Sequence, residues 1–486
     1  MNPLQAPSGR SSSEEAEKHA HGISVATKDV DTGAALVAGM SGDLDPDDVA
    51  RVRLGTVFYL SYLLFEYPQN LALQRFPVAS ISLFGALRWP ATAACTNFAG
   101  LFVARFILGI CEGSITAGFM IVSSMFYTRS EQTSRVGYWF LMNGTGSRGF
   151  IMSLLWMNLN HAVLSADYLW FYQFWFTAYQ NPGFAPWQWL MIITGILTLI
   201  TAVVYWFFFP DSPTNAWFLT PAERVIAIRR LKENQTGVEN KHFKKDQGFE
   251  GPKDMDLCSL CRARSDTELA QQSTANHRDI IGFSALQTTL LSCVDGFMEV
   301  ATIWTGVMIV SRIPNSRAYV GAVYFIPALV GVLMIEFLPW SNQIALLFAI
   351  WLVDIGITGF VLSLAWLTSV TAGHTKRVTT NAIMLSAYCV GNGLGPFMWQ
   401  TQYKPRNHIP WIVIGLCYLV CPLLLLTIRF MLSRENKKRD AEPVNDKFEE
   451  VYIEQVTADG KRIEVKVDKE FLDLTDIQNR DFRYVL

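Results

Sequence analysis

The stretch 98-FAGLFVARFILGICEGSITAGF-119 decides the fold class of this chain. It is 22 residues long, and Arg105 and Glu112 are its only charged side chains. The hydrocarbon core of a bilayer is about 30 Å thick, and about 20 residues of apolar helix are needed to cross it. The stretch therefore predicts a membrane-spanning helix.

Similar stretches recur along the chain, so ten spans are predicted in all. The runs are residues 54–73, 78–96, 98–119, 136–159, 187–209, 286–310, 318–338, 344–370, 378–399 and 409–431. They predict an N-terminal helical bundle at 54–209 and a C-terminal bundle at 286–432. Polar sequence makes up the rest, which we expect to be a disordered cytosolic N-terminal tail (1–53), a cytosolic central loop (210–285) and a cytosolic C-terminal tail (433–486).

The basic residues between the spans indicate orientation, because Lys and Arg collect in cytoplasmic loops. In the first half they follow the first, third and fifth spans, and the loops after the second and fourth contain none. In the second half they follow the sixth, eighth and tenth spans, although Lys404 and Arg406 do not fit. The two halves therefore require one more crossing within residues 210–285, where no apolar run is long enough.

If the N-terminal tail is also cytoplasmic, a second crossing is absent before residue 54. The two absences fall at equivalent places, so each half looks like six spans that have lost the first. Twelve helices in two six-helix repeats are an architecture of secondary transporters. The pattern of charges thus indicates a transporter before any motif is considered.

Four separated strings point to one family. They are RFILGICEG (105–113), WFFFPDSPTNAWFLTPAER (206–224), TAGHTKRVTTNAIMLSAYCVGNGLGP (371–396) and FLDLTDIQNRDFRYVL (471–486). Together they resemble the fungal anion:cation symporter branch of the major facilitator superfamily, the group of allantoate, nicotinate, pantothenate and biotin permeases. The resemblance covers nearly everything after Gly39. It implies an all-α integral membrane protein with two helical bundles and about ten spans, five in each bundle, instead of twelve.

The same resemblance implies that the first and seventh helices of the family are absent here. Residues 38–44 (AGMSGDL) and 280–286 (IIGFSAL) resemble the segments that follow those helices, but polar sequence precedes both. Two such losses at equivalent sites suit skipped exons or a faulty gene assembly. The chain as encoded is then expected to be inactive.

Composition excludes several other classes of function. A net charge of −2 argues against a nucleic-acid partner bound through bulk positive charge. Cys258 and Cys261 form one CxxC pair, but a zinc site needs two further ligands, so neither a metal nor another cofactor is expected. No Ser, His and Asp constellation indicates an enzyme, and we expect a monomer.

The C-terminal tail contains one pattern of its own. Residues 451–456 and 462–467 alternate in polarity around Ala458, Asp459 and Gly460. Such alternation on either side of an Asp-Gly turn predicts a β-hairpin. Its charged side chains place it outside the bilayer.

Polar groups inside the spans are the candidate functional residues, because an ionised side chain at mid-bilayer costs about 2.5 to 3.5 kcal/mol. Tyr59, Tyr62, Glu66 and Asn70 are spaced by three, four and four residues, so they share one face of the first span. Tyr62 is predicted to bind substrate, and Glu66 to serve proton coupling or gating. The alternative is that Glu66 only pairs with a cytoplasmic-side arginine.

The third span carries Arg105 and Glu112 on one face, with Gly109 between them. Its RxxxG pattern resembles a superfamily motif whose arginine is linked to proton coupling. Arg remains charged under all conditions, so it can hold a titrating or substrate carboxylate but cannot carry the proton itself. A purely structural pair between Arg105 and Glu112 is the alternative.

The ninth span supplies the remaining predicted substrate ligands, Asn381, Tyr388 and Asn392. Tyr388 and Asn392 each lie within about twenty degrees of Asn381 around a helix. Amides and phenols can bind a carboxylate or ureido group without burying a charge. Neighbouring glycines can also serve only to let helices pack closely.

The sixth span holds Asp295 and Glu299, four residues apart. Two carboxylates so close in a low dielectric cannot both ionise cheaply, so one of them is expected to hold a proton near neutral pH. This predicts a second place for proton coupling. Alternatively, these acids face the gap left by the absent seventh helix.

Entry of an anion into a cell that is negative inside is opposed by about 2.3 kcal/mol per 100 mV for each charge, so it requires cotransported cations. The resemblance implies a plasma-membrane secondary transporter that imports a small organic anion with protons by alternating access. The expected substrate is allantoate or another ureido acid, or a carboxylate vitamin such as nicotinate or pantothenate. The alternative function is a membrane nutrient sensor or scaffold that does not transport.

Overall fold

The computed structural model of the protein describes most of both halves. The described residues are 48–75, 98–146, 186–210, 212–234, 243–250, 285–339, 341–398, 406–443, 452–456, 462–466 and 472–486, with Cys95 and Tyr403. Most of the predicted second span, the end of the fourth, and the pair Cys258 and Cys261 lie outside these residues. So do residues 1–47 and 251–284, where the absent helices were expected.

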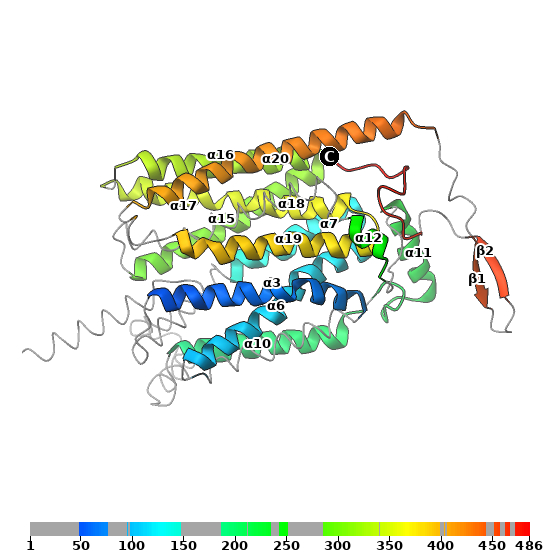
Figure 1. Ribbon diagram of the computed structural model, residues 1–486, viewed down its shortest axis with the longest axis horizontal. Helices are drawn as coiled ribbons and strands as arrows, with labels where there is room; N and C mark the ends of the chain where they lie inside the picture. Colours follow the sequence, from blue (N-terminus) through cyan, green and yellow to red (C-terminus); the bar gives the residue numbers. More distant parts are fainter. Residues whose placement is uncertain are drawn as a thin grey trace, which may run out of the picture.

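Long helices that run side by side make up the body of the described chain (Figure 1). The first half contributes α3 (Asp48–Arg75), α6 (Phe98–Phe126), α7 (Arg129–Gly146) and α10 (Pro186–Phe208). The second half contributes α15 (Ala285–Arg312), α16 (Arg317–Phe337), α17 (Gln343–Asp354), α18 (Gly356–Val370), α19 (His374–Leu394), η4 (Gly395–Met398) and α20 (His408–Asp440).

Five helical stretches within the described residues are long and apolar enough to cross a membrane. They are Ala99–Phe126, Val294–Arg312, Arg317–Phe337, Gln343–Val370 and His408–Asp440. Each coincides with a predicted span, so the prediction of a multi-pass integral membrane protein is confirmed. The predicted span 344–370 is divided into α17 and α18 near Ile355, and the Tyr418 hydroxyl donates to the Val353 carbonyl at this break (3.3 Å).

The outer surface of the helices is apolar, as a lipid-facing surface requires. On α20, Ile412, Leu416, Leu419 and Leu423 are exposed at spacings of four, three and four residues. Ile414, Cys421, Leu425 and Ile428 of the same helix are buried in the core. A helix that is apolar on both faces is buried on one by protein and on the other by lipid.

The two halves of the chain meet along two helix pairs. The α3 helix packs against α19, and α7 packs against α15. Leu73 and Val378 belong to the small core of the first pair, while Val136 and Val307 belong to the large core that includes the second. Two helices of each half therefore form the interface between the halves.

One end of the helices, hereafter the basic end, gathers positive charges from both halves. Arg317 donates to the carbonyl of Arg129 (2.8 Å), and Arg377 donates to Ser124 (3.0 Å). Both halves therefore place their basic residues at the same end, as the charge pattern requires. Arg406, which did not fit that pattern, instead caps the far end of α16 by donating to the carbonyls of Glu336 and Leu338 (3.2 Å each).

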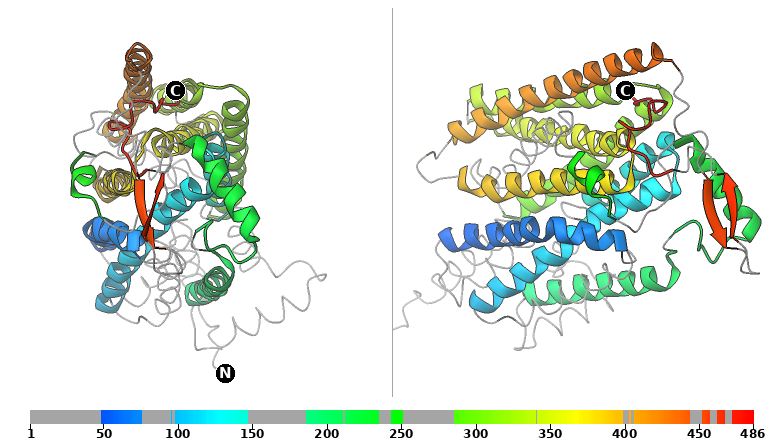
Figure 2. Two further views of the ribbon diagram at one scale, coloured as in Figure 1. Left: turned by 90° about the vertical axis from the view of Figure 1, so that its right-hand side faces the viewer. Right: turned by 45° about the vertical axis from the view of Figure 1, so that its right-hand side comes forward.

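Smaller elements lie beyond the basic end (Figure 2). They are α11 (Pro221–Leu231), η2 (Lys232–Asn234), α12 (Lys245–Glu250) and the antiparallel strands β1 (Tyr452–Val456) and β2 (Arg462–Lys466). Thr220 and Glu223 cap α11 reciprocally, and Pro221 occupies its first turn. The predicted hairpin is confirmed, with Val456 paired to Arg462.

Candidate functional site

The polar face of α3 is buried, as its spacing predicted. Tyr62 is 4% exposed, and Glu66 and Asn70 are fully buried. The Asn70 side-chain nitrogen donates to Oε1 of Glu66 (2.6 Å) and to the Glu66 carbonyl (2.9 Å). The alternative arginine partner for Glu66 is not observed in the described part of the chain. The carboxyl of Glu66 is instead held by its own helix.

The α6 helix crosses this face at two glycines. A Cβ atom at Gly109 would overlap the carbonyl of Phe58 and the hydroxyl of Ser61. A Cβ atom at Gly113 would lie 2.6 Å from Oε1 of Gln69 and 2.9 Å from the Tyr62 ring. The glycine of the RxxxG motif is therefore required for close packing of α6 on α3.

Close packing brings the charged residues of α6 beside the polar face of α3. Arg105 and Glu112 are both half-buried and lie two helical turns apart. Glu112 directly precedes Gly113, where α6 approaches the Tyr62 ring, and Glu66 lies one helical turn after Tyr62 on α3. Carboxyl groups of two different helices thus lie near one phenol.

Tyr388 of α19 completes this group from the other half of the chain. Its ring lies edge-on to the rings of Tyr59 and Tyr62, with centroids 6.1 Å apart in both pairs. We call Tyr59, Tyr62, Glu66, Glu112 and Tyr388 the tyrosine–carboxylate cluster. It joins α3, α6 and α19, and so lies where the two halves meet.

The two predicted asparagines of α19 differ in their surroundings. Asn392 lies one turn beyond Tyr388 and donates to its carbonyl (3.1 Å). Asn381 lies about 10 Å nearer the basic end than Tyr388 does, and it is 1% exposed. Among the described residues neither atom of its amide has a hydrogen-bond partner. An unsatisfied buried amide costs about 1–3 kcal/mol per group, so Asn381 is suited to acquire a partner in another state.

Asp295 and Glu299 are buried on α15, but they are not part of the cluster. The α15 helix packs mainly against α7 and α18, whereas the cluster lies on α3, α6 and α19. The structure therefore separates the two predicted sets of acidic residues.

Sequence reasoning missed several residues beside the cluster and at the basic end. Gln69 lies beside Tyr62 where α6 crosses α3, and the stripe spacing could have identified it. The contacts that close the basic end were also missed, including the bond from Gln74 to Thr375 (3.2 Å). Only the basic character of Arg129, Arg317 and Arg377 was visible in the sequence.

Comparison with known proteins agrees with this architecture. The Major Facilitator Superfamily matches residues 32–396. The thiamine pathway transporter of Saccharomyces cerevisiae is 31% identical, and the match covers 89% of this chain and 77% of that protein. The high affinity cysteine transporter of the same yeast is 28% identical over 89% and 82%, and its allantoate permease is 26% identical over 94% and 82%. The chain is thus similar to fungal membrane transporters of small molecules, and it belongs to the Major Facilitator Superfamily.

Proposed function

We propose that the chain is built as a secondary active transporter that imports a small organic anion together with protons, by alternating access, across the fungal plasma membrane. The observation that carries this proposal is the tyrosine–carboxylate cluster, in which groups from both halves meet at a buried interface. The likeness to allantoate permease supports a ureido acid such as allantoate. Nicotinate and pantothenate are the other candidates.

The residues divide into two roles under this proposal. Tyr62, Asn381, Tyr388 and Asn392 offer neutral hydrogen-bonding groups for a carboxylate or ureido group. Glu66 and Glu112 exchange the proton, with Arg105 holding the charged partner, and Asp295 and Glu299 form a second, separate place for a proton. A carried proton offsets the cost of moving an anion toward a negative interior, about 2.3 kcal/mol per 100 mV.

Uptake by yeast that lacks its own permeases tests the function. Cells expressing the chain, with a crossing restored as described in the Discussion, are expected to accumulate labelled allantoate, nicotinate or pantothenate at pH 5. A protonophore should abolish the uptake. Absence of uptake for all three substrates, in cells where the protein reaches the plasma membrane, would favour the sensor or scaffold instead.

In the same assay, Glu66→Gln is expected to remove the dependence of uptake on pH, so that rates at pH 5 and pH 7 become equal. Glutamine keeps an oxygen for the bond from Asn70 but cannot release a proton. Glu223→Gln on the exposed helix α11 is the control and should retain the pH dependence of the parent. A pH dependence that survives in Glu66→Gln would assign the coupling to another acid, and Asp295 and Glu299 would be tested next.

A further inference from the structure

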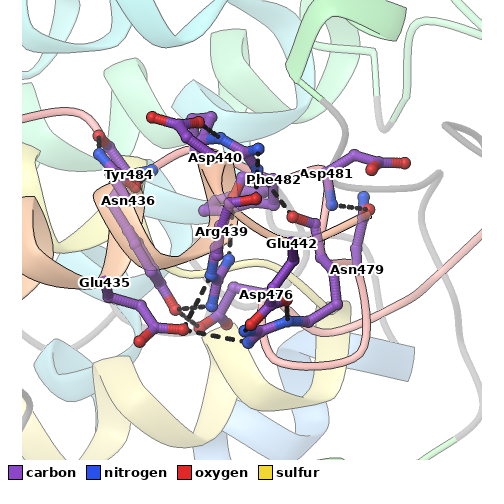
Figure 3. A network of polar contacts seen from close by, with 12 residues as sticks. Glu435, Asn436, Arg439, Asp440, Glu442, Asp476, Asn479, Asp481, Phe482 and Tyr484 are labelled. Atoms are coloured by element: carbon purple, nitrogen blue, oxygen red, sulfur yellow. Dashed lines mark hydrogen bonds and ion pairs between the residues drawn. The ribbon is translucent and has the colours of Figure 1, made fainter. Parts of the chain in front are cut away.

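The last part of the C-terminal tail, residues 472–486 and hereafter the tail, is folded against the basic end (Figure 3). Thr475 and Gln478 exchange hydrogen bonds between side chain and backbone (3.2 Å each), and the Phe482 amide donates to the Asn479 carbonyl (3.2 Å). Thr475 and Phe482 are fully buried. These contacts give the tail a defined shape and a defined seat.

The tail is anchored first to α20, in the second half. Asn436 donates to the carbonyl of Tyr484 (2.8 Å) and accepts from its amide (2.9 Å). Arg439 donates to the Phe482 carbonyl (2.8 Å) and to the Tyr484 hydroxyl (2.9 Å). Figure 3 shows Arg439 between the two tail residues that it holds. In addition, the Trp366 indole donates to the Val485 carbonyl (2.7 Å).

The tail also reaches the first half and the central loop. The Arg129 guanidinium of α7 lies 3.7 Å above the Phe482 ring and donates to the Arg483 carbonyl (3.1 Å). Lys244, just before α12, pairs with Asp473 at 2.9 Å. One short segment therefore contacts both halves of the protein and the loop that connects them.

The surface beneath the tail brings positive charges of both halves close together, and the tail reduces their repulsion. Arg129 from the first half lies near Arg317 and Arg377 from the second, and Lys376 directly precedes Arg377. We call these four residues the cationic seam. Burial, with the charges of Arg377 and Arg317, lowers the pKa of Arg129 to about 9, while Asp476 acts in the opposite direction. Arg129 remains charged at neutral pH, so the arginines of the two halves repel one another.

The tail supplies the opposite charges. Oδ1 of Asp476 lies 2.9 Å from Nζ of Lys376, and each side chain is only 2% exposed. Asp473 accepts a bond from the His374 amide (2.7 Å), and both aspartates act on the buried charge of Arg377. A buried charge that loses its partner is strongly destabilising. Asp473 and Asp476 therefore offset the positive charges that α19 brings to the seam, and Asp476 also favours the charged form of Arg129 from the first half.

We propose that residues 472–486 form an electrostatic clamp that holds the two halves together at the basic end until the tail detaches. The positive-inside rule places this end in the cytoplasm, so the clamp would control opening toward the cytoplasm. That consequence rests on the alternating access of the proposed function. The clamp itself is a contact between halves and requires no particular substrate.

Hydrogen exchange of the purified full chain, measured by mass spectrometry without substrate, tests the clamp. The double variant Asp473→Asn, Asp476→Asn keeps side-chain volume and removes both charges. Backbone amides of residues 124–135 and 371–377 are expected to exchange at least about tenfold faster than in the parent, because buried partners are lost. Asp440→Asn is the matched control: its pair with Arg483 of the tail is exposed, with side chains 64% and 40% accessible, and such pairs contribute little.

Deletion of residues 472–486 separates a clamp from a folding element. The deletion should accelerate exchange in the same two segments, and a synthetic peptide of residues 472–486 should restore protection. The same peptide with both aspartates changed to asparagine should not. Parent-like exchange in the double variant, or faster exchange along all the helices, would overturn the proposal. Because no transport is measured, this outcome is independent of whether the proposed substrate is correct.

Discussion

Replacement of residues 265–279 by an apolar helix of about 20 residues is expected to convert a chain without transport into a transporter. The reason lies in the positions of Glu250 and Ala285, which flank the replaced stretch. Glu250 lies beside Lys376 at the basic end (3.5 Å). Ala285 begins a helix of 28 residues, about 42 Å long, whose other end, Arg312, is at the basic end. Glu250 and Ala285 are therefore at opposite ends of the molecule.

The sequence between these two residues is poorly suited to cross a bilayer. Residues 265–279 include Asp266, Glu268, Arg278 and Asp279. At about 2.5 kcal/mol for a charge at mid-bilayer, and less for charges near the ends of the crossing, the four cost up to about 10 kcal/mol. That cost is similar to the whole stability of a typical protein, about 5 to 15 kcal/mol. In the unaltered chain, either this stretch crosses the bilayer or one half inserts against its own charge bias.

The measurement is proton-dependent uptake of allantoate, nicotinate and pantothenate in a transport-deficient yeast. The 486-residue chain is expected to give no uptake. The form with the apolar helix is expected to give saturable uptake, as is a third form that also carries an apolar helix before Asp48. Replacement of residues 265–279 by a glycine–serine linker of the same length as the apolar helix is the control and should remain inactive. Saturable uptake by the unaltered chain would refute the requirement for another crossing.

The helix faces and their orientation could be predicted because they depend on local spacing. Tyr62, Glu66 and Asn70 recur at helical intervals, and the structure buries all three on one face. The agreement between halves at the basic end could be predicted from charge, since insertion follows the distribution of Lys and Arg. Both properties are set by residues within a few turns of one another.

The remaining features depend on contacts between residues far apart in the chain. Asn381 has nearly the same helical phase as Tyr388, yet Tyr388 contacts rings of α3 whereas the Asn381 amide has no hydrogen-bond partner among the described residues. Residue spacing predicts which face of a helix a side chain lies on. It does not predict where along that helix a neighbouring helix crosses. The clamp was missed for the same reason, because Asp476 and Lys376 are 100 positions apart. The motif at residues 471–486 resembles the family, but it does not indicate which residues the tail contacts.

The α3–α6 crossing leads to the second large expected effect. Gly109→Ala should destabilise the protein by about 3 kcal/mol or more, because the added methyl group overlaps a backbone carbonyl, at Phe58, that cannot move without shifting the helix. The tyrosine–carboxylate cluster is built on this crossing. Gly109→Ala is therefore also expected to separate Glu112 from Tyr62 and abolish any ligand-dependent stabilisation.

Two further glycine substitutions distinguish overlap with backbone from overlap with side chains. Gly113→Ala should cost less, about 2 kcal/mol, because its close neighbours are side chains, the end of Gln69 and the Tyr62 ring, rather than backbone. Gly55→Ala on α3 meets nothing within 4 Å and should stabilise the helix by about 0.5–1 kcal/mol. The melting temperature of the purified protein should therefore fall in the order Gly55→Ala, parent, Gly113→Ala, Gly109→Ala. If Gly109→Ala melts with the parent, α6 does not cross α3 at this glycine, and the cluster that depends on the crossing must be placed differently.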